Sequence, residues 1–128
     1  MSNTYFELNK TNIMSEFRIL GDDFTPEVIT EKLEIFPSKV WKKGEKIEGS
    51  NKVRDYSCWC LSTGYDESYD INEQLNKLLT ILIPKKMKLI ELKELLSLDY
   101  KIDIVINIES NEKPAIYLEK KSYNFLMI

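Results

Sequence analysis

Residues 17–45 read FRILGDDFTPEVITEKLEIFPSKVWKKGE, and their order decides the first half of the fold. Phe17 and Ile19 are apolar side chains two residues apart, which is the period of a β-strand. A Gly-Asp-Asp step at 21–23 then breaks the extended run. We therefore expect a short strand over Ser15–Leu20 that ends in a turn.

A helix is predicted directly after that turn. Thr25 is a suitable N-cap, because its hydroxyl can accept a hydrogen bond from an orphan backbone N–H of the first turn. Pro26 fits the first helical position, where no N–H is required. We expect the helix to run to about Glu34, since Pro37 prevents its continuation.

A β-hairpin is predicted next. Lys39–Ile47 has the character of an extended segment and Val53–Ser62 that of a strand, with a Gly-Ser-Asn turn signal at Gly49 between them. Alternation along the second strand places Trp59 on one side and the two flanking cysteines on the other. The two segments are therefore expected to pair, with the turn near Gly49.

The second half of the chain predicts one clear helix and one clear strand. Asp70, with Glu73 three residues later, resembles a capping box. Leucines at helical spacing follow it, and Pro84 ends the pattern. From Lys101 to Glu109, isoleucines alternate with more polar residues, which is typical of a strand with one buried face and one wet face.

Four or five strands and two or three helices favour an α+β fold, a two-layer sandwich with helices on one face of a mainly antiparallel sheet. Two segments leave the count open. Met87–Leu98 suits a helix among other arrangements, and Ala115–Ile128 suits a strand or a short helix. We expect residues 1–14 to form an N-terminal extension and residues 15–128 a single domain, with the second sheet face partly exposed.

Composition narrows the functional classes. The chain has 128 residues, of which 43% are hydrophobic and 30% charged, as in a globular domain. It has neither an apolar run of roughly 20 residues, as a membrane span requires, nor the basic-then-apolar order of a secretion signal. We therefore expect a cytoplasmic protein that binds no membrane. The net charge of −3 argues against nucleic-acid binding, which depends on concentrated lysine and arginine.

The absence of histidine reduces the case for an enzyme. Histidine is the usual general base at neutral pH and the commonest metal ligand, and this chain has none. Cys58 and Cys60 lack the two further Cys or His ligands that a metal site usually needs, so we expect them to be structural. Asp22 and Asp23 are expected to shape the turn and favour the positive end of the helix dipole. The sequence thus assigns no catalytic residue, metal or cofactor.

Read in order, these elements resemble the DUF4279 family, small bacterial proteins that share a domain of unknown function. The resemblance covers about Ser15 to Ile108. It rests on a strand ending in Gly-Asp, a Pro-x-x-Ile-Thr helix start, a later Pro, a Lys-Gly-Glu step, a strand tryptophan and a Leu-Leu helix near a Pro. The matching positions are Phe17, Ile19, Gly21, Asp22, Pro26, Ile29, Thr30, Leu33, Pro37, Lys43, Gly44, Glu45, Trp59, Leu78, Leu79 and Pro84.

The resemblance implies a fold and a bacterial setting, but no established activity and no catalytic residues. Two departures stand out. Glu34 follows Leu33 where the family commonly has glycine, which affects the expected helix exit. The family's last strand, rich in alternating Asp and Ile, has no evident counterpart, which would leave an exposed sheet edge.

Two tryptophans near a basic loop form the main candidate binding site, as a pocket or as an anchor for a partner. The opposing interpretation is that Trp59 belongs to the core and Trp41 covers an edge of it. The Gly44 step lacks the glycine spacing of a phosphate-binding loop. The candidate residues are Trp41, Lys43, Gly44, Glu45, Arg54 and Trp59.

Two functional hypotheses follow. The first is a protein-binding module, since the chain is small, acidic and without histidine. A narrower form of this hypothesis is an immunity-type protein that neutralises a toxin. The alternative is a small-ligand-binding protein or enzyme that uses a pocket near Trp41 and Trp59. A homodimer is also expected if the last strand is missing, because apolar residues would remain uncovered.

Overall fold

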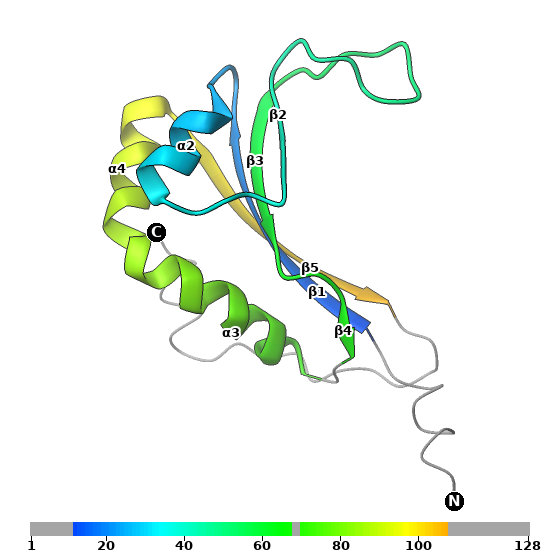
Figure 1. The fold of residues 1–128 in the computed structure, drawn as a ribbon, viewed down its shortest axis with the longest axis vertical. Helices are drawn as coiled ribbons and strands as arrows, with labels where there is room; N and C mark the ends of the chain where they lie inside the picture. Colours follow the sequence, from blue (N-terminus) through cyan, green and yellow to red (C-terminus); the bar gives the residue numbers. More distant parts are fainter. Residues whose placement is uncertain (1–11, 68–69, 108–128) are drawn as a thin grey trace, which may run out of the picture.

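The computed structural model describes residues 12–67 and 70–107. Five antiparallel strands form one sheet, and helices lie against one of its faces, so the predicted α+β two-layer sandwich is confirmed (Figure 1). The elements are β1 (Asn12–Gly21), α2 (Pro26–Leu33), β2 (Lys39–Trp41), β3 (Ser57–Ser62), β4 (Asp66–Glu67), α3 (Ile71–Leu82), the 3₁₀-helix η1 (Ile83–Lys85), α4 (Lys86–Leu96) and β5 (Asp99–Asn107).

Strand β1 lies at the centre of the sheet. On one side it pairs with β3, from Glu16 opposite Ser62 to Gly21 opposite Ser57. The short strand β4 continues along that side, and β2 pairs with β3 further out. On the other side β1 pairs with β5 along the length from Asn12 to Leu20. Residues 12–14, expected to belong to the N-terminal extension, are therefore part of the sheet.

One face of the sheet and the helices enclose the main core. Phe17 and Ile19 of β1 point into it as predicted, beside Trp59 of β3. The indole N–H of Trp59 donates to Thr30 Oγ1 on α2 at 3.0 Å, so this buried tryptophan is both packed and hydrogen-bonded. The fully buried core members from the helices are Ile29, Leu33, Leu75, Leu78, Leu79, Leu82 and Leu89.

Helix α2 begins and ends at the predicted positions, but its ends differ in detail. Thr25 is the N-cap residue, yet its hydroxyl makes no capping bond; the Val28 N–H donates instead to the Thr25 carbonyl at 3.0 Å. Glu34 ends the helix in the left-handed conformation, with φ of 57°. This is the conformation that glycine adopts most easily at a helix C-terminus. Glu34 therefore makes, at this helix exit, the turn that the resemblance associated with glycine.

The second half of the chain follows its predicted pattern. Asp70 accepts a hydrogen bond from the Asn72 N–H at 2.9 Å at the start of α3. After η1, which contains Pro84, α4 occupies most of the segment that the sequence left open. Strand β5 begins at Asp99, two residues before the predicted start at Lys101. Glu109 and the segment 115–128 lie outside the described residues.

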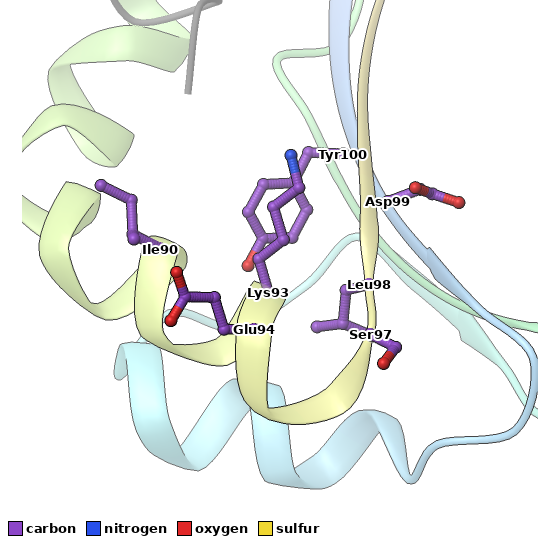
Figure 2. Close-up of a pocket in the computed structure, with 7 residues that line it drawn as sticks. All are labelled: Ile90, Lys93, Glu94, Ser97, Leu98, Asp99 and Tyr100. Carbon is purple, nitrogen blue, oxygen red and sulfur yellow. The ribbon is translucent and has the colours of Figure 1, made fainter.

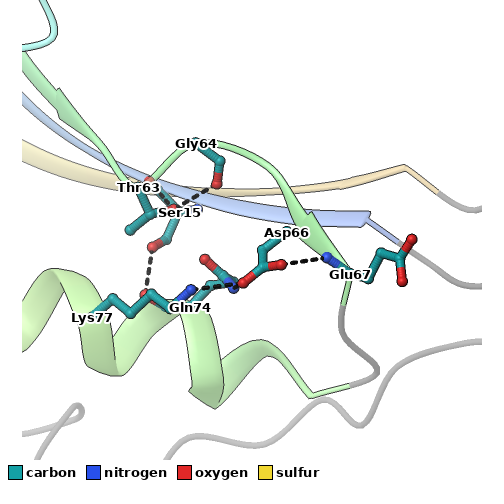
Figure 3. Close-up of polar contacts among 7 residues, drawn as sticks. All are labelled: Ser15, Thr63, Gly64, Asp66, Glu67, Gln74 and Lys77. Atoms are coloured by element: carbon teal, nitrogen blue, oxygen red, sulfur yellow. Dashed lines mark hydrogen bonds and ion pairs between the residues drawn. The ribbon is translucent and has the colours of Figure 1, made fainter.

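Ser15 connects the sheet to α3 at the point where β1 changes partner from β3 to β4 (Figure 3). Its backbone N–H donates to Thr63 Oγ1 at 3.0 Å, and its hydroxyl donates to the Gln74 carbonyl at 2.9 Å. Nearby, Asp66 of β4 accepts from Lys77 Nζ at 2.7 Å and from the Gln74 amide at 3.3 Å. These bonds hold α3 against the lower half of the sheet.

Candidate functional site: the open face of the sheet

The second face of the sheet carries no helix within the described residues, and we call it the open face (Figure 1). Alternation along the strands assigns to it the side chains that do not point to the helices. β3 pairs with β2 and β1, so these side chains form rows across the sheet. One row contains Trp41, Cys58, Leu20 and Asp99, and the next contains Lys39, Cys60, Arg18 and Lys101.

The register separates the two tryptophans. Trp59 lies opposite Val40, so Trp41 one residue later points to the other face. Trp59 belongs to the helix-covered core, whereas Trp41 forms a second cluster with Cys58 and Cys60. The two indole rings therefore do not line one pocket, and a binding site in this region contains Trp41 without Trp59.

Trp41 is the centre of a compact group that we call the Trp41 cluster, made of Lys39, Trp41, Arg54 and Tyr56. The Arg54 guanidinium carbon lies 4.0 Å from the Trp41 ring centroid, and Lys39 Nζ lies 5.3 Å from it. Tyr56 meets the same ring edge-on, with centroids 5.8 Å apart. Each cation–π contact contributes about 0.5–2 kcal/mol, depending on how far the cation is desolvated. These contacts hold both cations beside one ring.

The indole N–H of Trp41 has no hydrogen-bond acceptor among the described residues, although the side chain is only 5% exposed. An unmet buried donor costs about 1–3 kcal/mol. Trp59 differs, because its N–H is bonded to Thr30. Trp41 is thus buried like a core residue, but its indole N–H lacks the acceptor that a buried donor normally has.

Charged side chains of β1 and β5 border the Trp41 cluster. Arg18 Nε is bonded to Glu16 Oε1 and lies 3.7 Å from Asp103 Oδ2, while Lys101 Nζ lies 3.5 Å from Asp103 Oδ1. Burial by itself would raise the pKa of Glu16. Hydrogen bonds from Arg18 and Cys60, with the charges of Arg18 and Lys39, outweigh burial and place the pKa below its usual value. Glu16 is therefore ionised at neutral pH.

Cys58 and Cys60 are buried free thiols under this face. Burial is the main cause that raises the pKa of Cys58 to about 11 and that of Cys60 to about 12. At neutral pH both are protonated thiols rather than nucleophilic thiolates. Within residues 12–67 and 70–107, no group of three His, Cys, Asp or Glu side chains is arranged to hold a metal ion.

Residues 42–56 form an arm that joins β2 to β3 and extends beyond the sheet (Figure 1). Its two sides pair: the Gly44 N–H donates to the Arg54 carbonyl at 2.9 Å, and the Arg54 N–H donates to the Glu45 carbonyl at 2.7 Å. Lys46 and Val53 form a further antiparallel bridge. The predicted hairpin with its turn near Gly49 is confirmed, although β3 begins at Ser57 and not at the predicted Val53.

Ion pairs attach the base of the arm to the β1–α2 turn. Lys42 Nζ lies 2.9 Å from Asp23 Oδ1, and Lys43 Nζ lies 3.1 Å from Asp22 Oδ1. The Asp-Asp step, expected to serve the turn and the helix dipole, thus neutralises two of the basic residues that made the arm look positive. Gly44 takes a φ of 90°, where glycine avoids strain.

The six predicted site residues therefore divide into three groups. Trp41 and Arg54 come together on the open face, and Trp59 lies in the core. Lys43, Gly44 and Glu45 form the base of the arm, each through an ion pair or a backbone hydrogen bond. Lys39 was missed, although its position two residues before Trp41 on a strand places both side chains on one face.

A cavity of about 480 Å³ lies elsewhere, between the end of α4 and the start of β5 (Figure 2). The Tyr100 hydroxyl donates to the Leu89 carbonyl, and burial raises the pKa of Tyr100 to about 12. Lys93 Nζ lies 5.7 Å from the centroid of the Tyr100 ring. None of the six predicted site residues lines this cavity, whose walls are Ile90, Lys93, Glu94, Ser97, Leu98, Asp99 and Tyr100.

Fold and site together define a small α+β domain with one helix-covered sheet face and one open face built around Trp41. Within the described residues no helix is long and apolar enough to cross a membrane. The chain belongs to the DUF4279 family: the family model, described as a domain of unknown function, matches residues 9–127. Searches of curated proteins and of solved structures found no match.

The family match corrects one expectation from the sequence. The resemblance was placed between Ser15 and Ile108, with the family's last strand missing. The match instead continues to residue 127, so the family pattern includes the C-terminal segment. The expected homodimer stays a prediction.

Proposed function

We propose that this protein is a protein-binding module that docks its partner on the open face, around the Trp41 cluster. The observation that carries the proposal is the pairing of Arg54 with the Trp41 ring at 4.0 Å beside Tyr56. Trp, Tyr and Arg are the residues that most often dominate the binding energy of protein interfaces. Here contacts within the chain hold all three in place, which reduces the entropy lost on binding.

The surroundings of the cluster support a protein surface over a catalytic cleft. Arg54 and Tyr56 pack against the Trp41 ring, so the ring is not the floor of a hollow. Beside the cluster, Glu16, Arg18 and Asp103 of two neighbouring rows form one ion-pair network. Mixed charges around an aromatic centre are typical of a protein interface.

An immunity-type protein, which neutralises a toxin, is a narrower form of this proposal. Its support is the small size and the net charge of −3, which would steer a basic partner toward the chain. It would bind a single dedicated partner tightly. A broad set of weakly bound proteins would instead favour a general interaction domain.

Capture with matched variants tests the proposal. The full chain is immobilised and exposed to extract of the cells that produce it, beside Arg54→Ala, Tyr56→Ala and the control Leu95→Ser. Leu95 lies on α4, on the helix-covered side of the sheet, and is 71% exposed, so its substitution should leave the open face unchanged. We expect one stoichiometric partner, retained by wild type and Leu95→Ser and lost by the other two. The proposal is wrong if all four proteins capture alike or if Leu95→Ser alone loses the partner.

A second candidate function is small-ligand binding in the α4–β5 cavity. Its volume of about 480 Å³ falls in the range of ligand sites, and apolar and charged side chains both line it (Figure 2). An NMR fragment screen tests it through the backbone amides of Ser97 and Leu98. Fragments that shift these signals would support the cavity as a ligand site, and a screen without hits would remove it.

A further inference from the structure

We propose that Lys39, Trp41 and Arg54 form an anchor for a carboxylate, supplied by an aspartate or glutamate side chain of the partner protein. This inference rests on the proposed docking function and names the chemistry at its centre. Both cations lie against one buried aromatic ring.

The two cations have no acidic partner within the described residues. Arg18, Lys42 and Lys43 each form an ion pair with an aspartate or glutamate of the chain. Lys39 and Arg54 form none, and their contacts are with the Trp41 ring. Both cations lie close to one ring, so an anion bound beside that ring would be attracted by both.

The unmet donor of Trp41 is a second and independent sign of a missing acceptor. The side chain is 5% exposed, and its indole N–H has no acceptor in the described residues. A carboxylate can accept several hydrogen bonds at once, and its planar shape suits a guanidinium. Lys39, Arg54 and the indole N–H are the donors that this proposal assigns to the carboxylate.

The nearest acid of the chain does not fill this role. Glu16 is charged and lies near enough for Lys39 to help lower its pKa. It accepts its hydrogen bonds, however, from Arg18 and Cys60, and neither residue belongs to the Trp41 cluster. Its negative charge, with that of Asp103 beyond Arg18, favours a singly charged carboxylate over a doubly charged phosphate.

A local carboxylate anchor is compatible with a basic partner. Net charge acts over about a Debye length and mainly sets the rate of encounter, whereas a buried charge pair sets how long the complex lasts. A partner that is basic overall can therefore dock one acidic side chain at this site.

The two indole N–H signals in a ¹⁵N–¹H spectrum provide the test, since the chain has two tryptophans. Blocked tetrapeptides, acetyl-Gly-Glu-Glu-Gly-amide and its glutamine and phosphoserine counterparts, are titrated to about 10 mM, where weak binding is visible. We expect the glutamate peptide to move the Trp41 signal saturably and leave the Trp59 signal in place. The carboxylate assignment is wrong if the glutamine peptide shifts the Trp41 signal as much as the glutamate peptide does. It is also wrong if the phosphoserine peptide binds more tightly than the glutamate peptide.

Variants separate the anchor from general charge. Arg54→Gln and Lys39→Gln should each lower the affinity for the glutamate peptide by about tenfold, because each removes one charge-assisted hydrogen bond. Lys43→Gln is the matched control, because the Lys43 ammonium group is paired with Asp22, whereas the cation–π contacts of the ring are with Lys39 and Arg54. If Lys43→Gln lowers the affinity for the peptide equally, the effect is one of net charge and the proposal is wrong.

Failure of this inference and failure of the docking function give different results. If the peptides leave the Trp41 signal unchanged while Arg54→Ala still loses the captured partner, the open face binds by other chemistry and the anchor is wrong. If the glutamate peptide binds but no partner depends on Arg54, the anchor stands and the docking function falls.

Discussion

Trp41 and Trp59 are the same residue type, on neighbouring strands of one sheet, and both are buried. Trp59 packs among helix side chains and donates its N–H to Thr30. Trp41 packs against two cations and a tyrosine and donates its N–H to no described residue. Burial alone therefore does not mark a structural residue; whether its polar atoms are hydrogen-bonded separates the two roles.

The largest effect expected from this comparison is at Trp59. Trp59→Ala removes a fully buried ring and leaves Thr30 Oγ1 without its donor. We expect the free energy of unfolding in urea to fall by about 3–5 kcal/mol. A loss similar to that of an exposed substitution such as Leu95→Ser would contradict the placement of Trp59 in the core.

The next effect tests how tightly the helix-covered face is packed. A Cβ on Gly21 would lie 2.7 Å from Phe24 Cδ1 and 2.9 Å from Leu98 Cδ2. Gly21→Ala should therefore destabilise the protein by about 1–3 kcal/mol through overpacking. Gly49→Ala is a useful contrast, because its Cβ would meet no atom within 4 Å and only its φ of 76° opposes the change. Equal effects would mean that steric contact at Gly21 contributes little.

The open face contributes a pH dependence through Glu16. Its pKa is lowered in the folded state from an ordinary value of 4.5, since the bonds from Arg18 and Cys60 outweigh the effect of burial. A lowered carboxyl pKa stabilises the fold above the unfolded-state value, and the stabilisation is lost as the pH falls through the folded-state value. Urea unfolding at pH 7 and at pH 3 should thus show a smaller loss for Glu16→Gln than for wild type. An identical pH dependence would show that Glu16 is not held in its charged form.

A smaller effect of opposite sign is expected at the exit of α2. Glu34 holds φ of 57°, and its exposed ion pair with Lys88 spans 3.7 Å. Exposed pairs contribute little, so relief of the backbone strain should dominate. Glu34→Gly is expected to raise the melting temperature, through a gain of about 0.5–1 kcal/mol. A lower melting temperature would mean that the ion pair outweighs the strain.

The smallest change in stability is expected at Trp41. Trp41→Phe removes an N–H that has no acceptor to lose, so we expect a change in stability within about 1 kcal/mol. Trp59→Phe, which breaks a made bond, should cost more. Denaturant midpoints of the two variants, measured side by side, decide this. If Trp41→Phe is the more destabilising, the Trp41 N–H has a hydrogen bond and the contrast fails.

Local periodicity was enough to predict most of the fold. The alternation around Phe17 and the leucine spacing before Pro84 each define an element without distant contacts, and both elements form as expected. Hairpin register is different, because it sets which face each residue occupies and depends on pairing across the turn. The sequence therefore grouped Trp41 with Trp59, and the pairing of Val40 with Trp59 separates them.

Ion pairs between distant segments and one local backbone bond account for the remaining misses. The Asp22 and Asp23 carboxylates form ion pairs with two lysines of the arm, which offsets part of the apparent basic character of that segment. The Thr25 hydroxyl was expected to cap α2, but the backbone carbonyl takes the bond. Charge and capping patterns indicate which bonds are possible, and tertiary contacts choose among them.

The response of the two indole N–H signals to the captured partner tests the central claim most directly. The partner is added to ¹⁵N-labelled protein, with Trp41→Phe and Trp59→Phe used to assign the two signals. We expect the Trp41 signal to shift or be replaced on binding, and the Trp59 signal to keep its position. A partner that shifts Trp59 and leaves Trp41 unchanged would place the interface on the helix-covered side and contradict the account.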